Sequence, residues 1–305
     1  MDSYEVIIIG GGPAGLTAGL YTSRAGLKSL LIERGVFGGQ MVNARLVENY
    51  PGFPQGISGF DLGSLMHEQA AKYGLETSTA DVTGISPGKP HRVITTEDSL
   101  EAKAIIIAAG SQYRRLDVPG EGQFLGRGVS YCATCDGPLF RSEQVAVIGG
   151  GDTAVSDALE LSQYAQKVYL VHRRDQLRAS KVLQQRAFTE PKMEFVWDTV
   201  VEQVTGEQMV KALKLRNVKT GQLFTLEVAG VFVAVGLTPN SQPFAGILQL
   251  SETGHVVADE VLATSIPGIF VAGDIRRNSP RQIAGAVGDG ATAAMAAFRY
   301  LRALV

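Results

Sequence analysis

The sequence contains one glycine-rich unit twice, at a constant spacing of 139 residues. In each copy an apolar run leads into a glycine cluster, a stretch compatible with a helix and a second apolar run. At this offset Gly10, Gly12 and Gly15 fall on Gly149, Gly151 and Ala154. A G-x-G-x-x-G turn between a strand and a helix is typical of dinucleotide-binding βαβ units. The duplication therefore predicts two nucleotide-binding α/β domains.

The first copy has the pattern expected for a cofactor with a free adenosine ribose. We expect strands at residues 4–9 and 29–32 around a helix at 16–25. Its turn glycines permit a tight turn and let a pyrophosphate approach the backbone. The helix start follows at Pro13, and it offers free N–H groups from Ala14 onward. Glu33 follows the second strand, where a carboxylate accepts hydrogen bonds from both ribose hydroxyls. These features favour FAD.

The second copy carries basic residues where the first carries the acid. After strands expected at 145–148 and 168–171, His172 and Arg173 occupy the positions of Glu33 and Arg34, with Arg174 and Arg178 close by. Together they predict a cationic pocket for a 2′-phosphate, and a solvated basic face is the alternative. Two charge-assisted hydrogen bonds of about 1.5–3 kcal/mol each, less desolvation, favour NADPH over NADH by on the order of 10²-fold. The helix after this turn begins near Asp152 and Thr153.

Both cysteines lie in one short segment, as Cys132 and Cys135, followed by Asp136. A C-x-x-C pair can close as an exchangeable disulfide with depressed thiolate pKa values. A structural bridge or half of a zinc site is the alternative, but the sequence has no second cysteine pair and its four histidines are scattered. We therefore interpret the pair as redox-active and expect no metal. Asp136 is a candidate proton donor, or a residue that stabilises the turn ahead of Gly137.

Two glycine- and proline-containing segments, 113–128 and 239–246, are interpreted as crossings between domains. The second domain would then be inserted in the first, which predicts two Rossmann-like three-layer α/β domains. The expected boundaries are 1–114 with 246–305 for the FAD domain and 115–245 for the NADPH domain. Further expected elements are helices at 59–73 and 285–304, a strand at 104–108, strand-like material at 227–234, and strands at 255–259 and 268–272.

Composition limits the remaining classes of function. The net charge is −2 with no long run of like charge, so neither a nucleic-acid footprint nor a membrane-surface patch is expected. The two longest uncharged stretches are interrupted by glycine or proline, which argues against membrane spans. Two cysteines do not make a secreted disulfide framework, and no signal-peptide pattern precedes Tyr4. We expect a cytoplasmic protein.

With these motifs together and in this order, the chain closely resembles the low-molecular-weight, bacterial-type thioredoxin reductases, class II pyridine nucleotide-disulfide oxidoreductases. The matching segments run nearly the full length: 10–15, 38–40, 48–52, 132–137, 149–154, 172–174 with Arg178, and 273–274 with 281–282. The resemblance implies a homodimer that relays electrons from NADPH through FAD to the cysteine pair and then to thioredoxin or a related small dithiol protein.

The resemblance also implies roles for individual residues. Cys135 is the sulfur near the flavin, Cys132 attacks the partner's disulfide, and Asp136 exchanges the proton. Residues implied around FAD are Gly39, Gln40, Asn49, Ala109, Gly110, Gly273, Asp274, Arg281 and Gln282. Gly236 is the counterpart of Gly110 in the NADPH domain.

Several alternatives stay open from the sequence. The acceptor could be a peroxiredoxin or a glutaredoxin-like protein, because Pro138-Leu139 departs from the aromatic residues of some family members. Ferredoxin could be the donor, although the basic residues after the second copy's strand argue against it. An NAD(P)H oxidase or a ferredoxin–NADP reductase, either with bystander cysteines, and a redox-sensing flavoprotein are the other candidates. No role follows from the sequence for the basic segment Arg276-Arg277.

Overall fold

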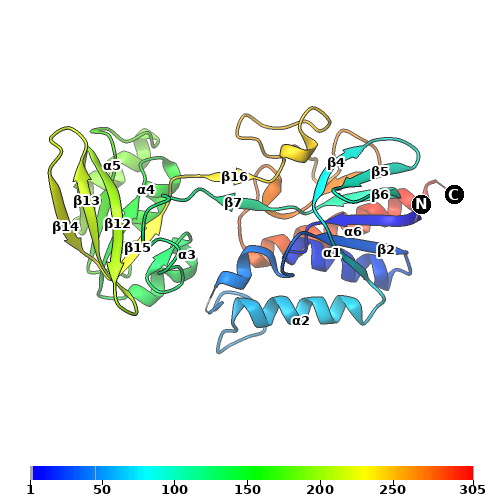
Figure 1. Ribbon diagram of the computed structural model, residues 1–305, viewed down its shortest axis with the longest axis horizontal. Helices are drawn as coiled ribbons and strands as arrows, with labels where there is room; N and C mark the ends of the chain where they lie inside the picture. Colours follow the sequence, from blue (N-terminus) through cyan, green and yellow to red (C-terminus); the bar gives the residue numbers. More distant parts are fainter. Residues whose placement is uncertain (1–2, 45, 305) are drawn as a thin grey trace. The chain divides into compact units, whose positions relative to one another are not determined.

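The computed structural model describes residues 3–44 and 46–304. The chain forms two compact units (Figure 1). Unit 1 comprises Met1–Gln112 and Thr238–Val305, and unit 2 comprises the inserted Tyr113–Leu237. The linking strands β7 (Ser111–Tyr113) and β16 (Leu237–Pro239) form a two-stranded sheet.

Unit 1 is built on a seven-stranded sheet with the order β3-β2-β1-β6-β5-β4, in which β17 also pairs with β6. The strands are β1 (Ser3–Ile9), β2 (Ser29–Glu33), β3 (Glu76–Thr79), β4 (Val82–Ser86), β5 (His91–Thr95), β6 (Ser99–Ile107) and β17 (Ile269–Val271). All neighbours are parallel except in the β4-β5-β6 meander.

Both faces of the unit 1 sheet are buried, which explains why β1 is a continuous apolar run. On one face Val6 and Ile8 pack under the helices α1 (Pro13–Arg24) and α6 (Ile283–Arg302). Figure 1 shows α2 (Gly59–Ala71) on this helical side of the sheet, in the blue-to-cyan part of the chain. On the other face Ile7 and Ile9 belong to a second cluster with residues of β4, β5 and the segment around Phe244. Short 3-10 turns complete unit 1: η1 (Gly39–Asn43), η3 (Gln242–Phe244) and η4 (Gly273–Ile275).

Unit 2 repeats this three-layer plan around a parallel sheet of order β11-β10-β9-β15-β8. Its strands are β8 (Val129–Ser130), β9 (Gln144–Ile148), β10 (Lys167–Val171), β11 (Met193–Val196) and β15 (Gly230–Val233). One face carries α3 (Ala133–Asp136), η2 (Gly137–Phe140), α4 (Asp152–Leu161) and α5 (Lys181–Thr189). The other face carries an antiparallel sheet of β12 (Thr199–Gly206), β13 (Val210–Asn217) and β14 (Leu223–Glu227).

The duplication seen in the sequence is present in the structure. Ile9 and Ile148 end the first strand of each copy, and Pro13 and Asp152 begin each helix, so both pairs lie 139 residues apart. The α/β fold with two Rossmann-type units, one inserted in the other, is therefore confirmed.

The structure differs from the sequence-based expectations in three places. The expected strand at 227–234 is the end of β14 and, after a break, β15. Residues 255–259 form no strand, because Val256 makes only isolated bridges to Leu250 and Arg276. The second boundary between the units falls at Leu237, not at residue 245, because Phe244 is only 1% exposed and packs in the core of unit 1.

Among the described residues, the structure contains no helix with the length and apolar character needed to span a bilayer.

Candidate functional site

The glycine turn of unit 1 places bare backbone at the start of α1. Gly10 has a φ of 106°, and a Cβ there would lie 2.4 Å from the Ala108 carbonyl oxygen. Gly12 is the N-cap of α1 and no side chain caps the helix, so its first N–H groups stay available. The nearest atom to a Cβ on Gly12 would be the Cα of Gly39, 3.9 Å away. This uncapped helix start, with no side chain close to Gly12, fits the pyrophosphate of a dinucleotide.

Gly15 is required by local packing, since its Cβ would lie 1.8 Å from the carbonyl oxygen of Gly10. The second copy, whose Gly149 has a φ of 156° where Gly10 has 106°, accommodates Ala154 at the matching position. We expect Gly15→Ala to lower the free energy of unfolding by about 3 kcal/mol, as overpacking does at its upper range. Ala154→Gly should cost about 1 kcal/mol or less. Urea unfolding of both variants measures the difference, and equal losses would contradict this account.

The carboxylate of Glu33 lies at the end of β2, next to this turn. Its Oε2 accepts a hydrogen bond from the Gly11 N–H at 2.6 Å, and its Oε1 accepts one from the Gly35 N–H at 2.9 Å. The two backbone bonds hold the carboxylate beside the glycine turn. A carboxylate at this place suits ribose hydroxyls and repels a 2′-phosphate, so the site fits FAD.

Two of the predicted FAD residues of the C-terminal segment, Asp274 and Gln282, are hydrogen-bonded to residues of the N-terminal segment. Asn49 Nδ2 donates to Gln282 Oε1 at 3.1 Å, and Arg281 lies at a φ of 56°. Burial raises the pKa of the Asp274 carboxyl, and a 2.8 Å hydrogen bond from Ser279 opposes the rise. Gln40 lies in η1 beside Gly39.

The chain around Ala109 and Gly110 is fixed by residues that the sequence pattern did not identify. Asn240 Nδ2 donates to the Ala109 carbonyl at 2.6 Å, and the Asn240 N–H donates to the Gly110 carbonyl. Ser111 Oγ donates to the Asp274 carbonyl at 2.7 Å. The Asn240 bonds join the end of β6 to the residue that follows β16, and the Ser111 bond joins it to the segment that follows β17.

The glycine turn of unit 2 has the same open helix start. Gly151 is the N-cap of α4, no side chain caps the helix, and a Cβ on Gly151 would meet no atom within 4 Å. Asp152 Oδ1 accepts from the Ser180 N–H at 2.6 Å, while Thr153 lies in the first turn of α4. Gly236 has a φ of 120°, and its carbonyl accepts from the Arg114 N–H.

The basic residues near this turn divide into a buried histidine and exposed arginines. His172 is 4% exposed, and a Cβ on Gly150 would lie 2.4 Å from its ring. Burial and the charge of Arg178 lower the pKa of His172, so its ring is neutral near pH 7. His172 belongs to the cationic pocket expected from the sequence, and the positive charges of that pocket are those of its arginines. Arg173, Arg174 and Arg178 are all exposed, and their charges fit a 2′-phosphate.

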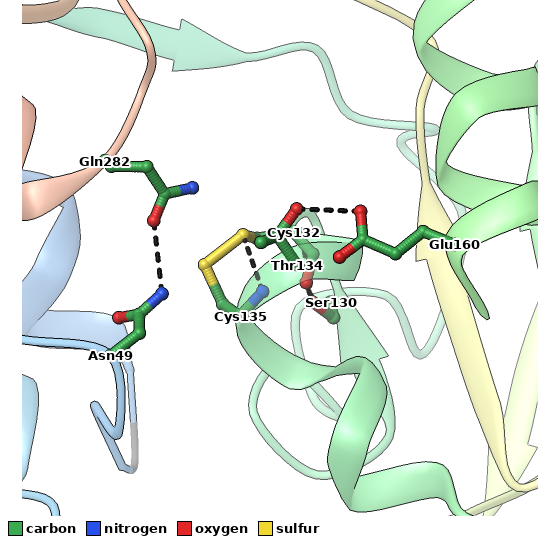
Figure 2. The surroundings of a disulfide bond; sticks show 7 residues. All are labelled: Asn49, Ser130, Cys132, Thr134, Cys135, Glu160 and Gln282. Atoms are coloured by element: carbon green, nitrogen blue, oxygen red, sulfur yellow. Dashed lines mark hydrogen bonds between the residues drawn. A yellow bond between two sulfur atoms is a disulfide. The ribbon is translucent and has the colours of Figure 1, made fainter. Parts of the chain in front are cut away.

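The cysteine pair is closed as a disulfide at the start of α3 (Figure 2). The S–S distance is 2.06 Å, and the two Cα atoms are 5.3 Å apart. Cys132 is the N-cap of α3, and its Sγ accepts from the Cys135 N–H at 3.1 Å. Ala133 anchors the turn in the unit 2 core, while Cys135 stays exposed. In the described part of the chain no three or more His, Cys, Asp or Glu residues gather as a metal-binding group.

Asp136 follows the disulfide and is positioned by the same short helix. Its backbone N–H donates to the Cys132 carbonyl at 3.1 Å. Burial raises the pKa of the Asp136 carboxyl, and a hydrogen bond from Ser130 opposes the rise. Ser130 also accepts from the Cys132 N–H at 3.0 Å, so it contacts both residues. A buried carboxyl with a raised pKa next to a disulfide is suited to giving and taking a proton.

Thr134, between the two cysteines, donates from Oγ1 to Oε2 of Glu160 on α4 at 2.9 Å (Figure 2). Sequence patterns did not predict this contact, because Glu160 is 26 residues away. They also did not predict the contacts of Ser130 with Cys132 and Asp136, because Ser130 belongs to no motif. A hydroxyl two residues before a C-x-x-C pair is the one signal that could have identified Ser130.

Known proteins are similar to this chain in both sequence and fold. Residues 4–290 match the family model of the pyridine nucleotide-disulphide oxidoreductases. The chain is 47% identical over 303 residues to a thioredoxin reductase of Listeria innocua, an alignment that covers 99% of this chain and 95% of that protein. It is 48% identical over 307 residues to one from Streptomyces coelicolor, with the same coverage. The crystal structure of the thioredoxin reductase from Streptococcus pyogenes is 46% identical, with a TM-score of 0.95 and 99% of each chain covered.

Proposed function

Because this chain belongs to the bacterial-type thioredoxin reductases of the pyridine nucleotide-disulphide oxidoreductase family, we propose that it carries electrons from NADPH through FAD to the Cys132–Cys135 disulfide and on to thioredoxin. The observation that supports this best is the exposed disulfide turn with Asp136 beside it, in the same unit as the arginine-lined glycine turn. FAD, held at Gly12, Glu33 and Asp274, supplies the two-electron chemistry when bound.

Reduction of the disulfide takes up two electrons and yields one thiol or thiolate on each cysteine. We assign the attack on the acceptor to the Cys132 thiolate, which forms a bond to one acceptor sulfur and displaces the other. Asp136 gives its proton to the displaced thiolate. The Cys135 thiol then gives its proton to the Asp136 carboxylate and attacks the Cys132 sulfur of the mixed disulfide. The bond from Cys132 to the acceptor breaks as the intramolecular disulfide is restored. The second acceptor sulfur leaves as a thiolate and takes up this proton, so the acceptor is released as a dithiol.

We assign NADPH preference to the exposed arginines at the end of β10. The double variant Arg173→Ala with Arg174→Ala should lower the NADPH over NADH ratio of kcat/KM by on the order of 10²-fold, because it removes two charge-assisted contacts to the 2′-phosphate. The kcat/KM for NADH itself should change by less than about threefold. Steady-state kinetics with both nucleotides measure the ratio. The matched control is Arg186→Ala on α5, which should leave this ratio unchanged. An unchanged ratio in the double variant would contradict the assignment.

The acceptor is tested by multiple-turnover reduction of purified, oxidised thioredoxin with NADPH in the presence of FAD. Rapid turnover supports the proposal, whereas turnover only with a peroxiredoxin or a glutaredoxin-like protein would reassign the acceptor and keep the relay. We also propose that the working form is a homodimer, and sedimentation velocity of the holoenzyme tests this.

A further inference from the structure

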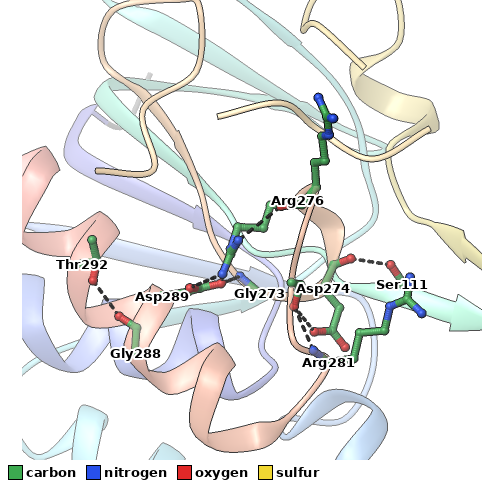
Figure 3. A network of polar contacts seen from close by, with 10 residues as sticks. Ser111, Gly273, Asp274, Arg276, Arg281, Gly288, Asp289 and Thr292 are labelled. Carbon is green, nitrogen blue, oxygen red and sulfur yellow. Dashed lines mark hydrogen bonds and ion pairs between the residues drawn. The ribbon is translucent and has the colours of Figure 1, made fainter. Parts of the chain in front are cut away.

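Arg276, in the basic segment that the sequence left unexplained, is committed to one buried carboxylate (Figure 3). Its Nε donates to Asp289 Oδ2 at 2.6 Å, and its Nη2 donates to Asp289 Oδ1 at 2.9 Å. The side chains of Arg276 and Asp289 are only 18% and 11% exposed. This is a bidentate, partly buried pair, which fixes the geometry of both side chains.

Asp289 also binds the backbone that leads to the predicted flavin site. Its Oδ2 accepts from the Gly273 N–H at 2.9 Å, a contact that lies within unit 1 and is drawn in Figure 3. Gly273 has a φ of 76°, and its Cβ would lie 3.0 Å from the Cβ of Ala14. On the other side, a Cβ on Gly290 would lie 2.2 Å from the Ala14 carbonyl oxygen. The first turn of α1 is thus in contact with both η4 and α6.

We propose that Arg276 and Asp289 are positioning residues for FAD, an inference that rests on the proposed function. The pair holds the Gly273 N–H and thereby sets the peptide that carries Asp274 against the phosphate-facing start of α1. Neither residue belongs to a nucleotide-binding motif, and α6 presents Asp289 from the second turn of a helix that otherwise packs on α1.

The charge pair is suited to this task because one carboxylate has to satisfy three donors in a partly buried place. Replacing Arg276 removes two of the three donors to the Asp289 carboxylate. Removing the charge on Asp289 leaves the partly buried guanidinium of Arg276 without its counter-charge. Either change loosens the side chain at position 289 that holds the Gly273 N–H. The neighbouring Arg277 is exposed and its side chain takes no part in the pair, so it is the matched control.

The experiment titrates FAD into the full-length protein after removal of its flavin, and follows quenching of flavin fluorescence. Arg276→Met and Asp289→Asn should each raise the Kd for FAD at least about tenfold, while Arg277→Met stays within about twofold. NADPH binding, followed through the fluorescence of Trp197 beside His172, should stay within about twofold in all variants, because that site is in unit 2.

A double variant, Arg276→Met with Asp289→Leu, separates positioning from stability. It buries no lone charge, so its Tm should recover toward wild type. The leucine removes the acceptor of the Gly273 N–H, so FAD binding should stay weak. Recovery of FAD affinity together with Tm, or an equal loss in Arg277→Met, would overturn the inference. A wild-type chain that binds no FAD would overturn the proposed function as well, whereas unchanged affinity in the variants overturns this inference alone.

Discussion

Replacing Cys132 with serine is expected to lower thioredoxin-linked oxidation of NADPH to below about a thousandth of the wild-type rate. Serine can neither close the disulfide nor act as the attacking thiolate, so the relay stops at the flavin. Reduction of ferricyanide by NADPH should stay within about twofold, because an artificial acceptor takes electrons without the cysteines. Both rates are measured on one preparation with bound FAD.

Thr134→Ala is the matched control for this variant, since Thr134 is exposed in the same turn and its hydroxyl makes one surface hydrogen bond to Glu160. It should retain both activities. Thioredoxin turnover that survives in Cys132→Ser would show the cysteines to be bystanders. Loss of the ferricyanide activity as well would show that the turn supports the fold and not the relay alone.

Asp136→Asn should slow dithiol turnover by on the order of 10³-fold, within the 10²–10⁴-fold range of general acid–base catalysis. Asparagine has about the same size and can keep the contact with Ser130, but it has no proton to give to a departing thiolate. Flavin reduction by NADPH does not use this carboxyl and should be unchanged within about twofold. Stopped-flow measurement of both half-reactions tests the prediction, and unchanged rates in both would remove the assigned role.

The same variant has an expected effect on stability that depends on pH. Burial raises the pKa of Asp136, so between the unfolded and the folded pKa values the folded chain binds more protons than the unfolded chain. Stability of the wild type therefore falls as pH rises through this window and stays reduced above it. The asparagine side chain cannot ionise, so the Tm of Asp136→Asn should exceed that of the wild type at about pH 8, with a smaller difference as the pH is lowered through the window. Thermal unfolding across this pH range measures the difference, and a constant difference would contradict the raised pKa.

The sequence predicted those parts of the site that local chemistry determines. The backbone of one turn requires glycine at positions 10 and 15, and one short helix holds Cys132 and Cys135. The spacing of these residues in the sequence was therefore enough to predict a nucleotide-binding turn and a disulfide. The open start of α4 and the exposed arginines at the end of β10 follow the same pattern. The two crossing segments also predicted the insertion of one domain in the other.

Features that depend on packing between distant segments were not predictable in this way. His172 appeared basic in sequence, but its burial under Gly150 makes it neutral. The partner of Arg276 is 13 residues away on a helix, and nothing in the spacing marks Asp289 as buried. Val256 belongs to an apolar run that resembles a strand, yet it finds only isolated bridges and no ladder.

The most direct test of the account is an anaerobic reduction of the purified, FAD-loaded protein with NADPH, followed by counting of thiols. The chain has two cysteines, both in the disulfide, so the account predicts two new thiols per chain with NADPH and far slower appearance with NADH. A flavin that bleaches while the thiol count stays at zero would contradict the transfer of electrons from FAD to the Cys132–Cys135 pair.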